Sequence, residues 1–238
     1  MVELIQSSIV HLATTDVSAA STRIKESWTW YLIRAAGFTA AGLLILLMLS
    51  GIGQVTGLTY RFIEPLKAWV IHKALAIALC IAIAIHVLFL LVDAYLPFTL
   101  TQVLVPFVSR YSNGSSLFSF KLGFIAVALG VFAMYGVALV VATSLGWIDS
   151  KKRLWRKTHY VSYFIIIAVF IHALGTGSDL KYGLFREAWI AVSLILVVAV
   201  ASRLWRARVV KRIDNHAIDS SSVAEPSTPY SKPLSPKS

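Results

Sequence analysis

Long apolar runs alternate with short polar or basic connections along most of the chain. A run of about 20 apolar residues is long enough to cross the hydrocarbon core of a bilayer as an α-helix. Five such runs are present, and their approximate limits are Tyr31–Gly51, Leu66–Tyr95, Leu117–Leu145, Thr158–Leu174 and Phe185–Leu204. The pattern predicts an all-α fold, an integral membrane bundle of about five transmembrane helices.

The ends of the chain differ from this membrane-spanning part. Residues 1–27 are mixed and polar, without a signal-peptide pattern, and predict a peripheral segment with one short interfacial helix that ends at residues 14–16. Residues 213–238 are rich in Ser and Pro and predict a disordered tail, because they have too little apolar surface to offset their ordering entropy. Residues 28–212 are then the transmembrane domain.

Composition and charge agree with a membrane location. Hydrophobic residues make up 58% of the chain, more than in a typical soluble domain, and the formal net charge is +11. The basic residues concentrate at 151–157 and 203–212, which five spans place on the same side of a membrane. The positive-inside rule therefore predicts a multi-pass plasma membrane protein with its N-terminus outside and its C-terminus in the cytoplasm, and it accounts for the charge better than nucleic-acid binding does. A single cysteine, Cys80, excludes an intramolecular disulfide and a Cys-based metal site.

Four histidines lie within the spans, although ionisable residues are costly there and mark functional sites. His72 and His86 are 14 residues apart in the second span, and His159 and His172 are 13 apart in the fourth. These spacings correspond to roughly 21 Å and 20 Å along the helix axes. Because both spans run in the same direction, His72 is expected level with His159 and His86 level with His172. His11 and His216 lie outside the spans.

Two level pairs of imidazoles suit haem iron, because two axial imidazoles saturate it and leave it able to carry electrons. The sequence thus predicts haems between the second and fourth spans. Two alternatives remain open: the histidines only hydrogen-bond neighbouring helices, or they form a proton relay in a non-redox transporter. Zinc is less favoured, because no carboxylate or cysteine lies near either pair to complete a usual site.

The angular positions of the histidines around their helix axes agree only in part with haems held between the two spans. Fourteen residues make nearly four helical turns, so His72 and His86 share a face, whereas 13 residues leave His159 and His172 about 140° apart on an ideal helix. A kink, overwinding or different rotamers must compensate, unless the fourth span does not use both histidines.

Three basic residues are further candidates for binding a cofactor. Arg34 lies in the first span, level with His86 and His172, where it needs an anion such as a haem propionate or else extends to the lipid headgroups. Lys73 and Arg156 lie at the opposite level and are candidate partners of the inner propionates.

Two short motifs accompany the histidines. W-Y-x-x-R-A-x-G opens the first span at Trp30, and R-K-x-H opens the fourth at Arg156. With these motifs and the two histidine pairs, the chain resembles the ferric reductase-like transmembrane family over roughly 28–205. That family includes NADPH oxidases, yeast-type ferric reductases and the bacterial haem subunit of the periplasmic methionine sulfoxide reductase system.

The resemblance implies two b-type haems. The inner haem b would be held by His72 and His159, and the outer haem b by His86 and His172. Members of the family use the same 13-residue spacing on this helix. The implied activity is that of a ferric reductase-like oxidoreductase, with transmembrane electron transfer to an extracytoplasmic acceptor such as ferric iron, oxygen or a redox protein. The runner-up is the haem-binding membrane subunit of a two-component periplasmic reductase system.

The electron donor is expected on a separate partner. The oxidases of the family carry an FAD and NADPH domain, whereas here no G-x-G-x-x-G motif follows a predicted strand and residues after 212 are too few for such a domain. We therefore expect the donor to be a flavoprotein reductase carrying FAD or FMN, or membrane quinol. The cytoplasmic basic residues are a candidate docking surface for an acidic reductase, although the positive-inside rule alone also accounts for them. The connection 96–117, which is expected to contain a short interfacial helix over 99–108, is the candidate contact for the acceptor.

Overall fold

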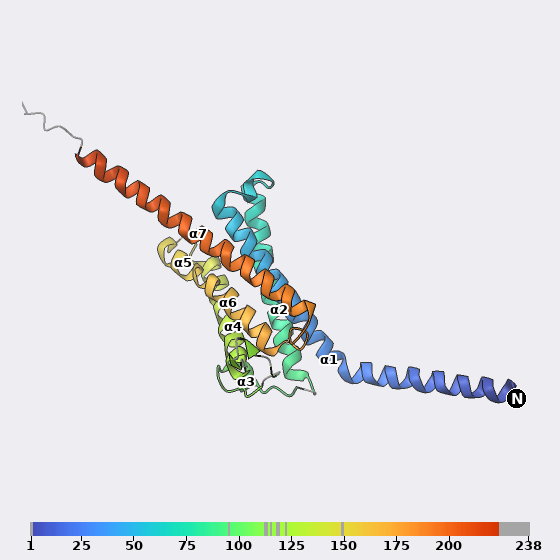
Figure 1. Ribbon diagram of the computed structural model, residues 1–238. Helices are drawn as coiled ribbons and strands as arrows, with labels where there is room; N and C mark the ends of the chain where they lie inside the picture. Colours follow the sequence, from blue (N-terminus) through green and yellow to red (C-terminus); the bar gives the residue numbers. More distant parts are fainter. Residues whose placement is uncertain are drawn as a thin grey trace, which may run out of the picture. The chain divides into compact units, whose positions relative to one another are not determined.

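A computed structural model describes the backbone of residues 2–223, apart from 95, 112–113, 115, 118–119, 122 and 149. Side chains are described for residues 28–209, apart from the same positions and from 116–117, 120–121 and 206–207. The described part is helical except for its connections and one pair of two-residue strands (Figure 1). The elements are α1 (Val2–Thr56), the 3₁₀ turn η1 (Thr59–Arg61), α2 (Pro65–Val92), α3 (Leu100–Leu104), β1 (Ser116–Leu117), β2 (Phe120–Lys121), α4 (Gly123–Gly146), α5 (Lys152–His159), α6 (Val161–Thr176) and α7 (Leu184–Val223).

Five helical segments are long and apolar enough to cross a membrane. They are Trp28–Thr56, Pro65–Val92, Gly123–Gly146, Lys152–Thr176 and Leu184–Trp205. The predicted all-α architecture with five spans is therefore confirmed, and the fourth span consists of α5 and α6 together.

The first four spans form two helical hairpins. In the first hairpin α1 packs along α2, and in the second α4 packs along α6. The hairpins meet where α1 contacts α6 and where α2 contacts α4. Small residues allow membrane helices to approach closely, and Ala126, Ala128 and Ala133 of α4 are accordingly buried. The start of α7 joins the second hairpin, because Trp189 packs edge-on against Phe170, with 4.8 Å between the ring centroids. Residues 196–238 form a separate unit, which begins with the continuation of α7.

Two predictions about the ends of the chain were wrong. The N-terminal helix does not stop at residues 14–16 but is part of α1, which is unbroken from Val2 to Thr56. Thr and Asp lower helix propensity without interrupting the backbone, and no glycine or proline precedes Gly37. At the other end α7 remains helical to Val223, so the predicted disorder does not begin at 213. Residues 224–238 lie outside the described part.

Three connections also differ from the prediction. The basic loop 151–157 is largely helical, because α5 begins at Lys152. The third span begins at Gly123, after the short antiparallel strands β1 and β2, and not at Leu117. The helix expected over 99–108 is only five residues long, and Thr99 caps it in a reciprocal pair of hydrogen bonds with Gln102.

Candidate functional site

His72 and His159 come together between the two hairpins, as their predicted levels require. Their ring centroids are 6.4 Å apart. Nδ1 of His72 lies 2.6 Å from Oγ of Ser50 on α1. His159 lies against the ring of Trp155, with 5.2 Å between centroids, and Nε1 of Trp155 donates to Oγ of Ser144 at 3.1 Å. Residues from α1, α2, α4 and α5 therefore meet at this level.

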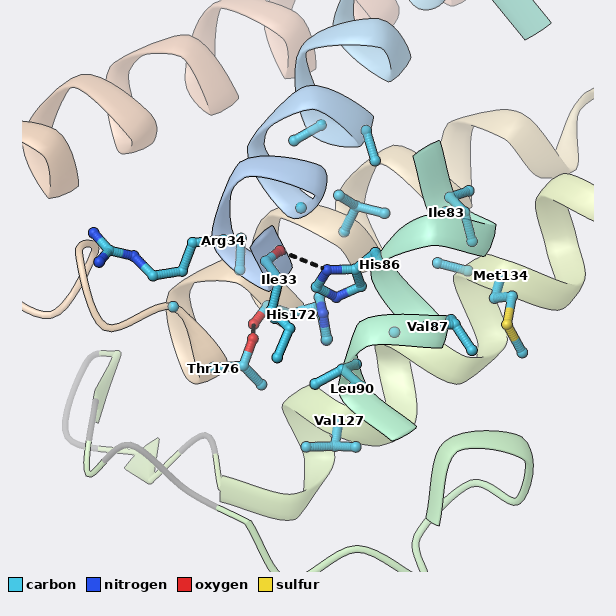
Figure 2. A pocket seen from close by; sticks show the side chains of 18 of the residues that line it. Ile33, Arg34, Ile83, His86, Val87, Leu90, Val127, Met134, His172 and Thr176 are labelled. Atoms are coloured by element: carbon cyan, nitrogen blue, oxygen red, sulfur yellow. Dashed lines mark hydrogen bonds between the residues drawn. The ribbon is translucent and has the colours of Figure 1, made fainter. Parts of the chain in front are cut away.

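His86 and His172 face the same cavity, and Figure 2 shows their side chains with the residues around them. Nδ1 of His86 is 2.9 Å from the carbonyl oxygen of Ile33, and Nδ1 of His172 is 2.8 Å from that of Ala126. A carbonyl oxygen only accepts, so Nδ1 carries the proton in both rings. The Nε2 atom of each neutral imidazole then keeps its lone pair available for a metal.

The cavity has a volume of about 250 Å³ and a mainly apolar lining. Most of its lining residues belong to α1, α2, α4 and α6, and the others come from α3, the start of α7 and the connections after α2, α3 and α6. Apolar lining residues include Ile33, Leu44, Leu79, Ile83, Val127, Val131, Met134 and Val169. The polar lining residues are few, and besides the histidines they include Arg34, Asp179 and Thr176. A mostly apolar cavity with a few placed polar groups is typical of a cofactor site.

Three of the four histidines lie against a glycine of the neighbouring helix. A Cβ built on each glycine shows how close this contact is. Its distance to Cε1 of the facing ring would be 3.2 Å for Gly37 and His86, 3.4 Å for Gly51 and His72, and 2.5 Å for Gly130 and His172. The absence of a side chain thus lets the backbone of α1 and α4 lie directly against the imidazoles.

The fourth span is interrupted immediately after His159. Tyr160 separates α5 from α6 and has a ψ of −19°, close to that of a 3₁₀ turn. The amide of Tyr160 bonds to the carbonyl of Lys157 at 3.3 Å, and the amide of Tyr163 bonds to the carbonyl of Tyr160 at 3.2 Å, which are both i to i+3 contacts. A 3₁₀ residue turns about 120° instead of about 100°, so three or four of them reduce the angular offset of His159 and His172 from about 140° to about 60–80°. Local overwinding next to His159 is therefore the one of the expected adjustments that these bonds support, and it removes about half of the angular offset.

Arg34 faces an anion, as expected of a cation in a span, but the anion belongs to the chain. Nε of Arg34 donates to Oδ2 of Asp179 at 2.7 Å, and Nη2 donates to Oδ1. The guanidinium carbon also lies 4.1 Å from the ring centroid of Trp30. This bidentate pair joins α1 to the connection after α6 at the edge of the cavity.

Lys73 directly follows His72 on α2, and Arg156 lies one turn before His159 on α5. Nζ of Lys73 lies over the ring of Trp69, 5.2 Å from its centroid. Arg156 is exposed in the last turn of α5, which ends at His159. Both side chains are placed at the correct level for the predicted propionate contacts, which stay predictions.

The family model described as "Ferric reductase like transmembrane component" matches residues 36–170, more than half of the chain. The chain belongs to this family. No curated protein and no solved structure matched it. The matched range includes His72, His86 and His159, and His172 follows two residues after its end. Membership in the ferric reductase-like family points to membrane electron transfer.

The sequence alone did not assign Ser50, Asp179 or Gly51 to this site, and Gly37 entered only as the last residue of the entrance motif, without its contact to His86. One signal for the glycines was available. They are 14 residues apart, as are His72 and His86. In an antiparallel hairpin, equal spacing on the two helices brings both pairs into register. No comparable signal pointed to Asp179, because its partner is far away in the sequence.

Proposed function

We propose that the chain carries electrons across the membrane through two b-type haems, one held by His72 and His159 and the other by His86 and His172. The observation that supports this most strongly is the arrangement of the four span histidines as two cross-helix pairs at two levels. One pair has its rings 6.4 Å apart, and the other shares a cavity.

The donor set fits haem iron in two respects. Histidines that bind metals usually donate their second N–H to a carbonyl or another acceptor, which fixes the ring and makes it a stronger ligand. Three of the four histidines have such a contact at Nδ1. Imidazoles on opposite sides of one metal, with metal–nitrogen bonds of about 2 Å, have ring centroids roughly 6 Å apart. The 6.4 Å between His72 and His159 agrees with that separation.

A haem with two imidazole ligands supplies one-electron transfer without an open coordination position. The residues of the chain hold the two ligand pairs in place and keep water away from them. Gly37, Gly51 and Gly130 let the neighbouring helices lie against three of the rings, and buried Leu79 occupies the stretch of α2 between its two histidines. The two levels are separated by roughly 21 Å along α2, most of a hydrocarbon core of about 30 Å, so two sites in series connect its two sides.

The basic residues are candidates for the charged edge of each haem. Arg34 lines the cavity of His86 and His172, where a propionate would compete with Asp179 for the guanidinium. Lys73 and Arg156 would serve the other level, where both side chains are exposed.

We infer the direction of transfer from the basic clusters. With the positively charged 151–157 segment on the cytoplasmic side, the His72 level is the inner site and receives electrons from a flavoprotein reductase or from quinol. The outer site, His86 and His172, passes them to an extracytoplasmic acceptor such as ferric iron, oxygen or a redox protein. The exposed residues Arg153, Arg156 and Lys157 offer a basic surface for an acidic donor protein.

The test is a reduced-minus-oxidised optical spectrum of the purified full chain, with the haem-to-protein ratio measured at the same time. We expect a b-type signal with two haems per chain, falling to one in His86→Ala or in His172→Ala. His216→Ala, outside the spans, is the matched control and should keep both. A chain without a b-type signal refutes the proposal and favours the proton relay, which needs no pigment. If His72→Ala spares the haem that His159→Ala removes, the pairing is wrong.

A further inference from the structure

The Nδ1 partners of His72, His86 and His172 differ in kind. His86 and His172 each bond to a backbone carbonyl, of Ile33 and Ala126 respectively. His72 instead bonds to a side chain, the hydroxyl of Ser50. Replacing a side chain does not remove a backbone carbonyl, but it does remove a hydroxyl. The His72 level therefore has a contact that evolution and mutagenesis can adjust separately.

The geometry around Ser50 determines which atom donates. Oγ lies 2.6 Å from Nδ1 of His72 and 3.0 Å from the carbonyl oxygen of Leu47, one turn earlier on α1. A hydroxyl has one proton to donate and can accept as well. Both contacts are hydrogen bonds only when Ser50 donates to Leu47 and accepts from Nδ1–H. The opposite arrangement, with the hydroxyl donating to Nδ1, gives up the bond to Leu47.

This chain of two hydrogen bonds fixes the tautomer of His72. With the proton on Nδ1, Nε2 is the nitrogen that carries a free lone pair. The bond from Ser50 to the helix carbonyl also restricts the serine rotamer, so the acceptor for Nδ1–H stays in one position. Hydrogen bonds in such a chain polarise and strengthen one another.

An acceptor on Nδ1–H makes the imidazole a stronger electron donor to a bound metal. Stronger donation favours the oxidised over the reduced iron, and hydrogen bonding around the ligands is one of the means by which a protein sets a haem potential. Because Ser50 contacts His72 and the level of His86 is roughly 21 Å away along α2, the effect is confined to one site.

We propose that Ser50 is a positioning residue that holds His72 in its ligating tautomer and lowers the reduction potential of the His72/His159 site, separately from the His86/His172 site. This rests on the proposed haem function. In the direction of transfer inferred above, Ser50 sets the potential at which the chain accepts electrons from its donor.

The experiment is a redox titration of the purified full chain, followed optically and by electron paramagnetic resonance. Ser50→Ala should raise the midpoint potential of one haem and leave the other unchanged. At a fixed potential, the ratio of reduced to oxidised iron at that site should rise on the order of tenfold, which is about 59 mV for a one-electron couple. Ser50→Thr keeps a hydroxyl and should titrate like the parent chain.

Ser193→Ala is the matched control, because Oγ of Ser193 also donates to a carbonyl of its own helix, that of Trp189 at 2.7 Å. It should change neither potential. If Ser50→Ala does not accumulate in membranes, Ser50→Cys, with its weaker acceptor, should shift the same haem in the same direction.

Three results would overturn the role of Ser50, and the first two are potentials that stay the same in Ser50→Ala and a shift that Ser50→Thr reproduces in full. Equal shifts of both haems would overturn it as well. All three differ from the failure of the haem function itself, in which the parent chain has no b-type signal to titrate.

Discussion

Adding a single methyl group at Gly130 should disturb the His86/His172 site more than the same change at any other glycine that faces a histidine. An added Cβ at 130 would lie 2.5 Å from Cε1 and 3.1 Å from Cγ of His172. Carbon atoms pack at about 3.5–4.0 Å, so the ring and α4 must separate by roughly 1 Å. The ring cannot turn away freely, because Nδ1 is bonded to the carbonyl of Ala126 at 2.8 Å.

The expected loss of haem affinity in Gly130→Ala follows from this steric conflict. Overfilling a packed site costs about 1–3 kcal/mol. If that cost falls on the ligating position of His172, haem affinity at this site drops about 5-fold to 150-fold, since 1.4 kcal/mol is a factor of ten. At Gly37 the contact with His86 would be 3.2 Å, which a shift of a few tenths of an ångström relieves, and at Gly51 the contact with His72 would be an ordinary 3.4 Å.

Two quantities are measured on each purified variant. The first is the haem-to-protein ratio, and the second is the rate at which haem is transferred to an excess of a haem-free acceptor protein. Gly130→Ala should bind close to one haem per chain and lose the second rapidly. Gly37→Ala should show a small effect, and Gly42→Ala, where an added Cβ meets nothing within 4 Å, should match the parent. Gly136→Ala provides a further control, because its Cβ would lie 2.8 Å from Ile165 and touch no imidazole.

Two outcomes would refute this reasoning. The first is full retention of both haems in Gly130→Ala. The second is an equal loss in Gly130→Ala and Gly136→Ala, because general overpacking of the second hairpin would then explain the effect without any contact to His172.

Two buried or half-buried polar pairs give further predictions, each measured as thermal unfolding of the detergent-solubilised protein by circular dichroism. Arg34→Met leaves the Asp179 carboxylate without its bidentate partner and should lower the free energy of unfolding by about 2 kcal/mol. As a comparison, Glu64→Gln breaks an exposed ion pair and should lower it by less than about 1 kcal/mol. Equal losses in the two variants would contradict the larger contribution of the Arg34–Asp179 pair. Thr29→Val removes the hydroxyl that donates to buried Asp93 and should cost about 1–3 kcal/mol. No loss in Thr29→Val would mean that water replaces the hydroxyl.

The outline of the fold was accessible from the sequence because it depends on local quantities. Hydropathy and run length predict spans, and the rise per residue along a helix converts the spacing of the histidines into two levels. The boundaries were less accessible. Nothing in the composition of 151–157 distinguished a basic loop from α5, because charged residues suit an exposed helix as well as a loop.

The sequence by itself determined that this chain has five membrane-spanning helices and two levels of histidine pairs, since both follow from distances along single helices. Only the tertiary structure decided how those histidines are turned and held. The 3₁₀ turn at Tyr160, the carbonyl behind His172, the hydroxyl of Ser50 and the partnership of Arg34 with Asp179 all depend on rotation about a helix axis or on a neighbour distant in sequence. Those quantities are set by helix packing, which a pattern along one chain does not contain.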